Sequence, residues 1–353
     1  MINGHGDDIY KYKLKVKSNF SSNIYAHADL SGLKRHLAER MDVIGSYPEP
    51  EPYSLEKALA DEYGIGSNEI MVTNGATEAI YLAAMLTNTG CGERGCMNII
   101  STPTFSEYAD ACRMFGGKTT GCDSGYKGRA THWICNPNNP TGTVVTGEEL
   151  LNMAASRKDD IFVIDQSYEH YTDKKLITDR EAAGSGNIIL IHSMTKQFCI
   201  PGLRLGYVTA PAQLISRLKA MRHPWSVNAL AIEAGMYLTK HKTKAIRDVD
   251  GLLKETQRLR DNINGIDGIS VRPTMTNFML ASIKGHKAAE LKEFLVNKYG
   301  ILIRDAANFE GLDDSYFRVA TQTRHENDML TEAIKDFMNH NSGSMLTNKK
   351  ATT

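Results

Sequence analysis

The feature that most constrains the fold is a regular alternation of short β-rich runs with amphipathic stretches, which begins at Glu69. Strands that alternate with crossover helices build a mostly parallel sheet covered by helices on both faces. Each run ends at Gly, Pro, Asn or Asp, or at a small polar residue, which favours a strand end there. The predicted strands are 70–73, 97–101, 131–135, 161–165, 188–192 and 206–210. The sequence therefore predicts an α/β protein with one large sheet.

The last third of the chain has a different pattern. Helical periodicity runs from residue 212 to about 265 and includes a charged stretch at 244–264, which predicts a connector between domains. From 269 to 340 the predicted order is strand, strand, helix, strand, strand, helix, which is typical of a small α+β domain. We predict an N-terminal arm that forms part of the small domain at 1–44, a large domain at 45–245, a small C-terminal domain at 246–340 and a flexible tail at 341–353.

Composition excludes several classes of function. The 353 residues include 41 Lys and Arg and 41 Asp and Glu, so the net charge is zero and no basic footprint for nucleic acid or an acidic membrane exists. Apolar runs fall far short of the roughly 18 residues of a membrane span, and the start does not have the pattern of a secretory signal. We expect a cytoplasmic protein with reduced cysteines, no metal site, and no nucleic-acid or membrane partner.

The first chemical signal is the sequence Thr-Asn-Gly-Ala-Thr-Glu at 73–78, between a predicted strand and a predicted helix. A glycine turn that opens a helix leaves backbone N–H groups unpaired at the positive end of the helix dipole, and this favours a phosphate. Thr77 could equally be a helix N-cap. No Gly-x-Gly-x-x-Gly or Walker pattern supports a dinucleotide or a nucleoside triphosphate.

The second signal is Lys196, in Ser-Met-Thr-Lys directly after the predicted strand at 188–192, with Arg204 eight residues further on. A lysine that follows a buried strand lies where α/β sheets bind ligands. Desolvation beside another cation lowers the pKa of such an amine, so that it can attack a carbonyl and form a Schiff base. The alternative is an ordinary surface lysine.

Two other strands end in polar groups. Asp165 ends the strand at 161–165, where a carboxylate is costly unless it meets a cation such as a protonated pyridine nitrogen, and Tyr168 follows it. The loop at 136–142 contains two prolines and a glycine, which fix a rigid turn that can present Asn139. Taken singly, each of these features is typical of an ordinary loop.

Together these residues resemble those of the fold-type I pyridoxal-phosphate (PLP) enzymes of the aminotransferase class I/II family, over a region from about residue 5 to residue 338. The resemblance implies a PLP-binding large domain and catalytic roles for Lys196 (the Schiff-base lysine), Asp165 (at the pyridine nitrogen) and Tyr168. Tyr47 matches a tyrosine that reaches the phosphate of the neighbouring subunit, which implies a homodimer. The other implied cofactor contacts are Asn139, with Tyr168, at the ring hydroxyl, Phe105 on the ring, and Gly75, Ala76, Thr77, Ser193 and Arg204 at the phosphate.

Within this family the chain looks most similar to the threonine-phosphate decarboxylases of cobalamin biosynthesis, whose sister group is the histidinol-phosphate aminotransferases. His5, the segment that ends at Asn23, and the segments 224–228 and 303–312 carry this similarity, whereas residues 25–27 depart from the usual pattern. Arg318 matches the arginine that binds the substrate carboxylate, and Arg304 matches a position used where substrates carry an added phosphate. Arg304 could instead pair with Asp305 or Glu310. The predicted substrate-binding residues are Arg318, Arg304, Asn23 and His5.

Three functions remain open at this level. The leading hypothesis is decarboxylation of a phosphorylated amino acid, threonine phosphate above all. The second is transamination of histidinol phosphate or another amino acid, because a small rotation of the bound substrate selects which bond at its α-carbon breaks. The third is a non-catalytic regulator that retains the fold.

Overall fold

The computed structural model describes residues 7–12, 15–89, 96–121, 126, 128–242 and 245–348, and the side chains up to residue 340. The chain divides into two compact units. Unit 1 comprises Met1–His27, Pro140–Thr143 and Asp248–Thr353, and unit 2 comprises Ala28–Asn139 and Val144–Arg247. The sequence placed the first boundary after residue 44, but unit 2 begins at Ala28 because Leu33 of helix α1 (Ser31–Glu39) packs in a core of that unit.

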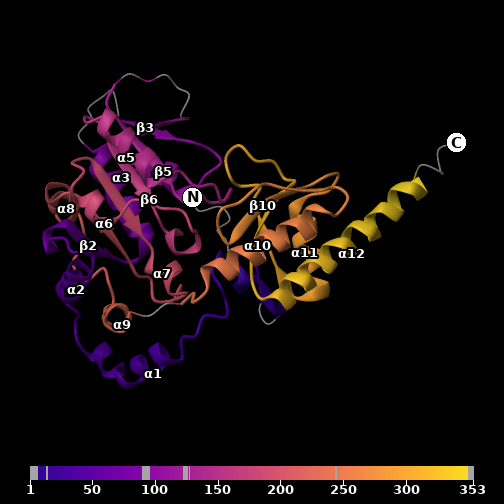
Figure 1. The fold of residues 1–353 in the computed structure, drawn as a ribbon, viewed down its shortest axis with the longest axis horizontal. Helices are drawn as coiled ribbons and strands as arrows, with labels where there is room; N and C mark the ends of the chain where they lie inside the picture. The colour runs from indigo at the N-terminus through magenta and orange to yellow at the C-terminus, as the bar shows by residue number, and fades with distance from the viewer. Residues whose placement is uncertain are drawn as a thin grey trace. The chain divides into compact units, whose positions relative to one another are not determined.

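Unit 2 is built on a sheet of seven strands in the order β2-β8-β7-β6-β5-β3-β4, as far as the chain is described (Figure 1). Neighbouring strands run parallel except β8, which is antiparallel to both β2 and β7. The six predicted strands are confirmed to within one residue at each end. The edge strand β4 escaped prediction because it is short and polar. The strands are β2 (Ile70–Thr73), β3 (Met97–Ile100), β4 (Lys118–Thr120), β5 (Ala130–Cys135), β6 (Ile161–Asp165), β7 (Ile188–His192) and β8 (Gly206–Thr209).

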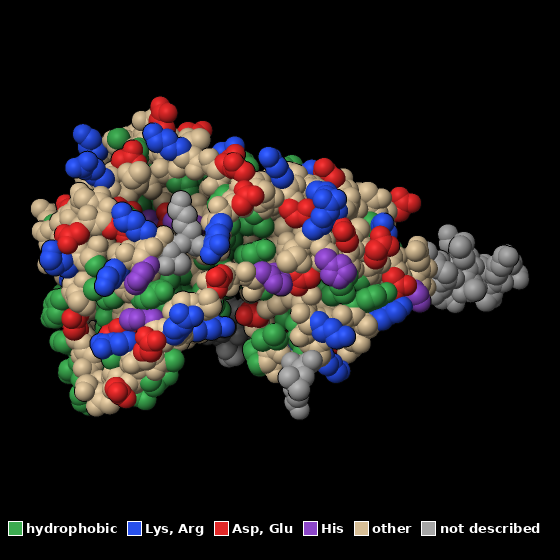
Figure 2. Space-filling model, turned by 60° about the horizontal axis from the view of Figure 1, so that its bottom comes forward, with side chains coloured by type: hydrophobic (Ala, Val, Ile, Leu, Met, Phe, Trp, Pro, Cys, Tyr) green, Lys and Arg blue, Asp and Glu red, His purple; other side chains and the backbone are tan. Residues whose placement is uncertain are grey.

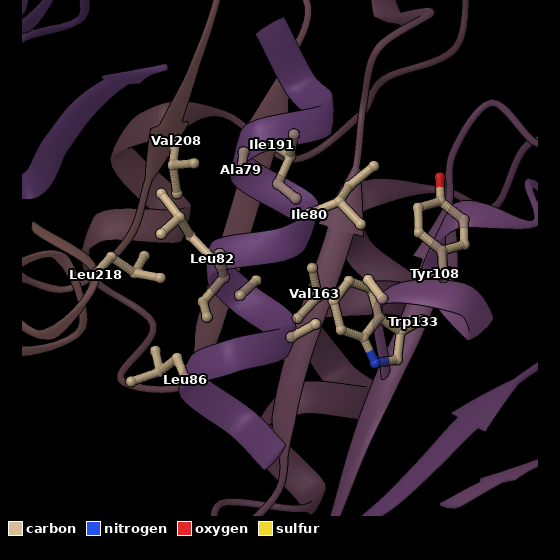
Figure 3. Packing of buried hydrophobic residues seen from close by; sticks show 14 of the residues in the cluster. Ala79, Ile80, Leu82, Leu86, Tyr108, Trp133, Val163, Ile191, Val208 and Leu218 are labelled. Atoms are coloured by element: carbon tan, nitrogen blue, oxygen red, sulfur yellow. The ribbon is translucent and has the colours of Figure 1, made fainter. Parts of the chain in front are cut away.

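Helices cover both faces of this sheet, so its central strands are apolar at successive positions. Val163 of β6 and Ile191 of β7 face α3 and lie in one buried cluster with its Ala79, Ile80 and Leu82 (Figure 3). The alternate residues of both strands, such as Phe162 and Leu190, pack on the opposite face. The remaining helices of unit 2 are α2 (Tyr53–Tyr63), α3 (Gly75–Asn88), α4 (Glu107–Met114), α5 (Gly147–Ser156), α6 (Asp179–Ala183), α7 (Met194–Gln197), α8 (Ala212–Lys219) and α9 (Ala229–Lys240), with 3-10 turns η3 (Met41–Gly45), η4 (Ser67–Glu69) and η6 (Glu169–Tyr171).

Unit 1 contains an antiparallel sheet in the order β12-β13-β10-β9 and a short parallel pair, β1 with β11. Its core is formed by buried aliphatic and aromatic side chains such as Leu295 and Phe317. The predicted tail begins at 341, but helix α12 continues to Asn348, since no proline interrupts it. The elements are η1 (Ile9–Lys11), β1 (Ser18–Asn19), α10 (Val249–Asn264), β9 (Ile269–Val271), β10 (Phe278–Ile283), α11 (Ala288–Tyr299), β11 (Ile301–Leu302), β12 (Arg304–Asp305), β13 (Tyr316–Ala320) and α12 (Arg324–Asn348).

The described residues also bear on three expectations from composition: those about membrane spans, surface charge and cysteines. None of its helices combines the length and the apolar character that crossing a membrane requires. Acidic and basic side chains are interspersed on the face shown in Figure 2. Cys112, Cys135 and Cys199 are free and buried, whereas Cys96 is disulfide-bonded, so the expectation of reduced cysteines is wrong for Cys96.

Candidate active site

The candidate site of unit 2 lies at one edge of the sheet. Strands β3, β5, β6 and β7 run parallel to one another. Strand β2 runs in the same direction, because β8 between β2 and β7 is antiparallel to both. The carboxyl ends of these five strands therefore lie at the same edge. The strand β8 begins there, since Gly206 pairs with Thr73 and Tyr207 with His192. Ligands bind at this edge of open α/β sheets, so the polar residues that follow these strands are the candidates.

Asp165 lies at the end of β6, in register with Cys135 of β5 and Ile191 of β7, and is 4% exposed. Its Oδ1 accepts a hydrogen bond from the backbone N–H of Ser167 at 2.8 Å, and its Oδ2 accepts one from the hydroxyl of Tyr108 at 2.7 Å. Burial, the largest effect, raises the pKa of Asp165, and the two hydrogen bonds only partly oppose it. A cationic ring nitrogen placed against this carboxylate would stabilise its ionised form.

Tyr108 is a site residue that the sequence analysis missed. Its ring stacks on Trp133 at 5.7 Å between centroids and meets Phe105 edge-on, also at 5.7 Å. Burial, and next the charge of Asp165, raise the pKa of its phenol well above the usual value. The hydroxyl therefore keeps its proton and donates a hydrogen bond to Asp165. The only signal in the sequence is a tyrosine three residues after Phe105 on an otherwise ordinary helix face.

Lys196 lies in α7 and is half-buried. Its Nζ is 5.9 Å from the ring centroid of Tyr168, and the hydroxyl of Tyr171 donates to its carbonyl oxygen at 2.9 Å. The structure therefore brings together Lys196, from α7, and Tyr168, from the loop after β6. Tyr171 was not predicted to take part.

The start of α3 lies against the side chain of Arg204. Gly75, Ala76 and Thr77 are the first three residues of the helix, and no side chain caps it, so Thr77 is not the N-cap; Asn74 occupies that position. Gly75 has a φ of +74°, and a Cβ there would lie 2.7 Å from Nη2 of Arg204. The guanidinium group thus lies directly over the helix start, where its charge adds to that of the helix dipole.

The loops that carry Phe105 and Asn139 are joined to each other. The side chain of Asn138 donates to the carbonyl oxygen of Pro103 at 3.0 Å and accepts from the hydroxyl of Thr104 at 2.7 Å. The backbone N–H of Asn139 donates to Sγ of Cys135 at the end of β5. Ser193 is the residue before α7 and is buried. In contrast, Tyr47 is 88% exposed and its ring packs at 5.4 Å from that of Trp225.

The predicted substrate arginines lie in unit 1, directly opposite each other in the register of β12 and β13. Arg304 and Arg318 are 6% and 4% exposed, and burial, the largest effect, lowers the pKa of Arg304. Nη2 of Arg304 donates to Oδ1 of Asn308, and Nη2 of Arg318 donates to the carbonyl oxygen of Ser21, both at 2.6 Å. Since facing residues of an antiparallel pair share one side of the sheet, the two cations are neighbours.

Asn23 also lies in unit 1, is fully buried, and has a φ of +56°. Neither its Oδ1 nor its Nδ2 has a hydrogen-bond partner among the described residues, and the same holds for Nδ2 of Asn277. A buried amide without a partner costs about 1–3 kcal/mol, which a polar ligand would recover. Asn277 was not predicted. His5 lies outside the described residues.

The residues of unit 2 fit PLP. They offer a buried carboxylate for the ring nitrogen, an amine for the aldehyde, an aromatic ring at Phe105, and a helix start with a guanidinium group for the phosphate. Within the described ranges, no group of three His, Cys, Asp or Glu side chains could hold a metal ion. The fold and this set of groups together define an α/β enzyme whose chemistry depends on a bound organic cofactor.

The chain belongs to the aminotransferase class I and II family, whose model matches residues 15–337. Members of this family are PLP-dependent, and this chain is accordingly a PLP-dependent enzyme. It is similar to the solved L-threonine-O-3-phosphate decarboxylase from Porphyromonas gingivalis, with 35% identity, a TM-score of 0.87, and 91% of this chain and 99% of that chain covered. This likeness confirms the fold-type I architecture.

Two curated relatives have different activities, one a decarboxylase and the other an aminotransferase. The threonine-phosphate decarboxylase of Salmonella typhimurium is 28% identical, with 91% of each chain covered. A histidinol-phosphate aminotransferase of Caldanaerobacter subterraneus is 26% identical, with 84% of this chain and 85% of the relative covered. Because the chain belongs to an enzyme family and has relatives with two activities, a non-catalytic regulator is no longer a competing hypothesis.

Proposed function

We propose that the enzyme decarboxylates a phosphorylated amino acid, O-phospho-L-threonine first, and serves cobalamin biosynthesis. The observation that carries the proposal is the facing pair of buried arginines, Arg304 and Arg318. A guanidinium group binds carboxylate or phosphate through two parallel hydrogen bonds, so adjacent arginines favour a ligand with two anionic groups. Threonine phosphate has both groups. Asn23 and His5 complete the proposed substrate site.

The proposed cofactor site assigns each group of unit 2 one task. Asp165 holds the proton of the ring nitrogen, Tyr168 and Asn139 bind the ring hydroxyl, and Lys196 binds the cofactor and carries the proton that replaces the departing group. Bound PLP supplies an electron sink for the electron pair left at the substrate α-carbon. Phe105 stacks on the ring, and the phosphate contacts are Gly75, Ala76, Thr77, Ser193 and Arg204.

The second candidate function is transamination, which the relatives named histidinol-phosphate aminotransferase favour. Histidinol phosphate has one phosphate and no carboxylate, so it would engage only one of the two facing arginines. A keto acid would have to use the other in the second half of the reaction. Both reactions require the same cofactor groups, and the choice therefore lies with the substrate-binding residues of unit 1.

A product assay separates the two functions. The enzyme is incubated with O-phosphothreonine or histidinol phosphate, each with and without 2-oxoglutarate, and carbon dioxide and glutamate are measured. We expect carbon dioxide from O-phosphothreonine at a rate independent of 2-oxoglutarate. Stoichiometric formation of glutamate, without carbon dioxide, would replace the decarboxylase by the aminotransferase.

We also propose that the enzyme is a homodimer in which Tyr47 reaches the phosphate in the partner's site. Tyr47 belongs to a segment with several exposed large apolar side chains, Met41, Ile44 and Tyr53, and the half-exposed Trp225 packs on its ring. Exposed apolar patches mark interaction sites. Sedimentation of the wild type and of Ile44→Glu tests this proposal. We expect the wild type to be a dimer and Ile44→Glu to be a monomer, and a monomeric wild type would overturn the proposal.

We place the enzyme in the cytoplasm. A phosphorylated amino acid carries several charges at neutral pH, and charged groups cross a bilayer only at high energetic cost. The enzyme therefore has to share the compartment in which its substrate is made. Fractionation of the cells that produce it tests this placement, and recovery outside the cytoplasmic fraction would contradict it.

A further inference from the structure

A buried histidine lies behind the candidate cofactor site. Asp165 pairs with Ile191 of β7, and because side chains alternate along a strand, His192 points to the opposite face of the sheet. His192 is 1% exposed, and its ring stacks on Tyr207 of β8 with 4.4 Å between centroids. The residue directly after it in the chain is Ser193, which precedes the turn of Lys196.

Two carboxylates hold this ring. Nδ1 of His192 lies 2.8 Å from Oε1 of Glu169, and Nε2 lies 3.2 Å from Oδ1 of Asp179. Burial opposes protonation of the imidazole, but the charges of Glu169 and Asp179 outweigh it and raise the pKa of His192 to about 10. The ring is therefore an imidazolium at neutral pH, hydrogen-bonded to Glu169 and ion-paired with Asp179.

This cluster connects the ends of three strands. Gln166, directly after β6, donates to Oε2 of Glu169 at 3.3 Å. Thr209 of β8 donates to Oδ1 of Asp179 at 2.7 Å. Glu169 itself is the residue directly after Tyr168. His192 is thus the central link between the loop that carries Tyr168 and the turn that carries Ser193 and Lys196.

We propose that His192 is a positioning residue that acts through Tyr168 and Ser193: its bridge between Glu169 and Asp179 fixes the β6 loop and the β7 turn in the arrangement that the cofactor needs. The inference rests on the proposed cofactor site of unit 2. Without the imidazolium, the carboxylates of Glu169 and Asp179 could bind water instead, because both residues line a cavity of about 340 Å³. The loop that holds Tyr168 would then lose its fixed position.

Several titratable groups surround His192, and an experiment with pH as the variable has to consider all of them. They are Glu169 of η6, Asp179 of α6, and Tyr207 of β8, whose hydroxyl donates at 3.0 Å to that of Tyr63 of α2. His170 of η6 belongs to the same cluster, since its Nε2 lies 3.4 Å from Oε1 of Glu169. Asp165 acts across the sheet: burial raises the pKa of that carboxyl, and the charge of His192 partly opposes this rise. Burial, the largest effect, keeps the pKa values of both tyrosines above their usual value, so neither ionises in the working range.

The chain contains a matched control. His132 of β5 is also buried, lies 2.8 Å from a carboxylate oxygen of Asp160, and stacks on Phe162 with 4.4 Å between ring centroids. Its hydrogen bond to Asp160 and its stacking on Phe162 involve none of the proposed cofactor residues, and it lies three residues before Cys135. His132→Gln therefore removes a comparable buried contact between a histidine and a carboxylate, at a site that does not involve Tyr168.

The experiment compares the holoenzymes of wild type, His192→Gln, Tyr168→Phe, the double variant and His132→Gln. The midpoint of the pH titration of the visible cofactor band and the PLP affinity of the apoprotein are measured for each. We expect Tyr168→Phe to shift the midpoint, His192→Gln to shift it in the same direction and to weaken PLP binding by about tenfold or more, and the double variant to shift it little further than Tyr168→Phe. His132→Gln should lower thermal stability and leave both readouts at wild-type values.

Two results would overturn the proposal: a wild-type midpoint and PLP affinity in His192→Gln, or shifts in the double variant that are the sum of the single ones. If His192→Gln does not fold, Glu169→Gln provides the same comparison, because it keeps the shape of the side chain while removing the charge that holds His192. Survival of the visible cofactor band in the Lys196→Ala variant would instead refute the cofactor site itself. The failure of the inference about His192 and the failure of the proposed cofactor site are therefore distinguishable.

Discussion

Gly75 provides the sharpest test of the proposed phosphate site. Its φ of +74° is a conformation that glycine adopts freely and L-residues avoid at a cost of roughly 1–2 kcal/mol. In Gly75→Ala, the added methyl group would also lie 2.7 Å from Nη2 and 3.2 Å from Cζ of Arg204, so the guanidinium group has to move off the helix start. The substitution therefore has two separable effects, backbone strain and displacement of a cation.

The two effects have different magnitudes and different readouts. Strain lowers the free energy of unfolding of the apoprotein by about 1–2 kcal/mol. Displacement of the guanidinium group removes a charge-assisted hydrogen bond worth about 1.5–3 kcal/mol, which corresponds to a rise of roughly 10- to 150-fold in the Kd for PLP. Chemical denaturation measures the first quantity, and titration of the apoprotein with PLP measures the second.

Gly64 supplies the matched control, because it has a φ of +66° at the C-cap of α2 and a Cβ there would have no atom within 4 Å. Gly64→Ala should lose as much stability as strain alone requires and bind PLP with the wild-type Kd. If Gly75→Ala keeps the wild-type Kd, Arg204 and the start of α3 do not hold the phosphate. Equal weakening of PLP binding in both variants would show that general destabilisation explains the effect.

Three further outcomes are expected. Lys196→Ala should lose the visible absorbance of the holoenzyme together with turnover, as spectra and the product assay will show; retained turnover would contradict the assignment. Arg304→Met should raise the KM for O-phosphothreonine, because it removes a buried charged contact worth roughly 2–5 kcal/mol of binding free energy. A substrate analogue without phosphate should bind as it does to wild type, and equal losses for both ligands would exclude a phosphate contact. Because the pKa of His192 is raised from 6.5 to about 10, its contribution to stability is complete below about pH 6.5 and is lost as the pH rises through 10. Calorimetry should therefore show a steeper fall in Tm between pH 7 and 10 for wild type than for His192→Gln, and parallel slopes would refute the buried imidazolium.

The central strands could be predicted from sequence because both their faces are buried. In β6 and β7, every position up to the last residue is apolar, and the polar residues at their ends belong to the proposed site: Asp165 in β6 and the His192–Ser193 pair in β7. The change from apolar to polar residues therefore predicts both the end of the strand and the candidate site residue. The strand β4 has no such contrast, since its three residues are Lys, Thr and Thr at the edge of the sheet.

Residues that act through contacts between distant elements could not be predicted in this way. Tyr108 becomes a partner of Asp165 only because the fold brings its hydroxyl from α4 to the end of β6, and its sequence neighbours do not indicate that contact. The cluster of Glu169, Asp179 and His192 likewise combines three elements, each of which has only one member of it. For the same reason the start of unit 2 at Ala28 depends on where α1 packs, not on a change in composition near residue 44.

The reversed direction of β8 has a consequence for how this enzyme can vary. Since β8 runs antiparallel to β7, the chain does not need to cross the sheet between them, and residues 193–205 form one short connection at the site edge. Lys196 and Arg204, which bind opposite ends of the cofactor in the proposed site, both lie on it. Inserting or deleting even one residue there would change the spacing between these two attachment points, so length variation among related chains should be tolerated in other loops and excluded from this one.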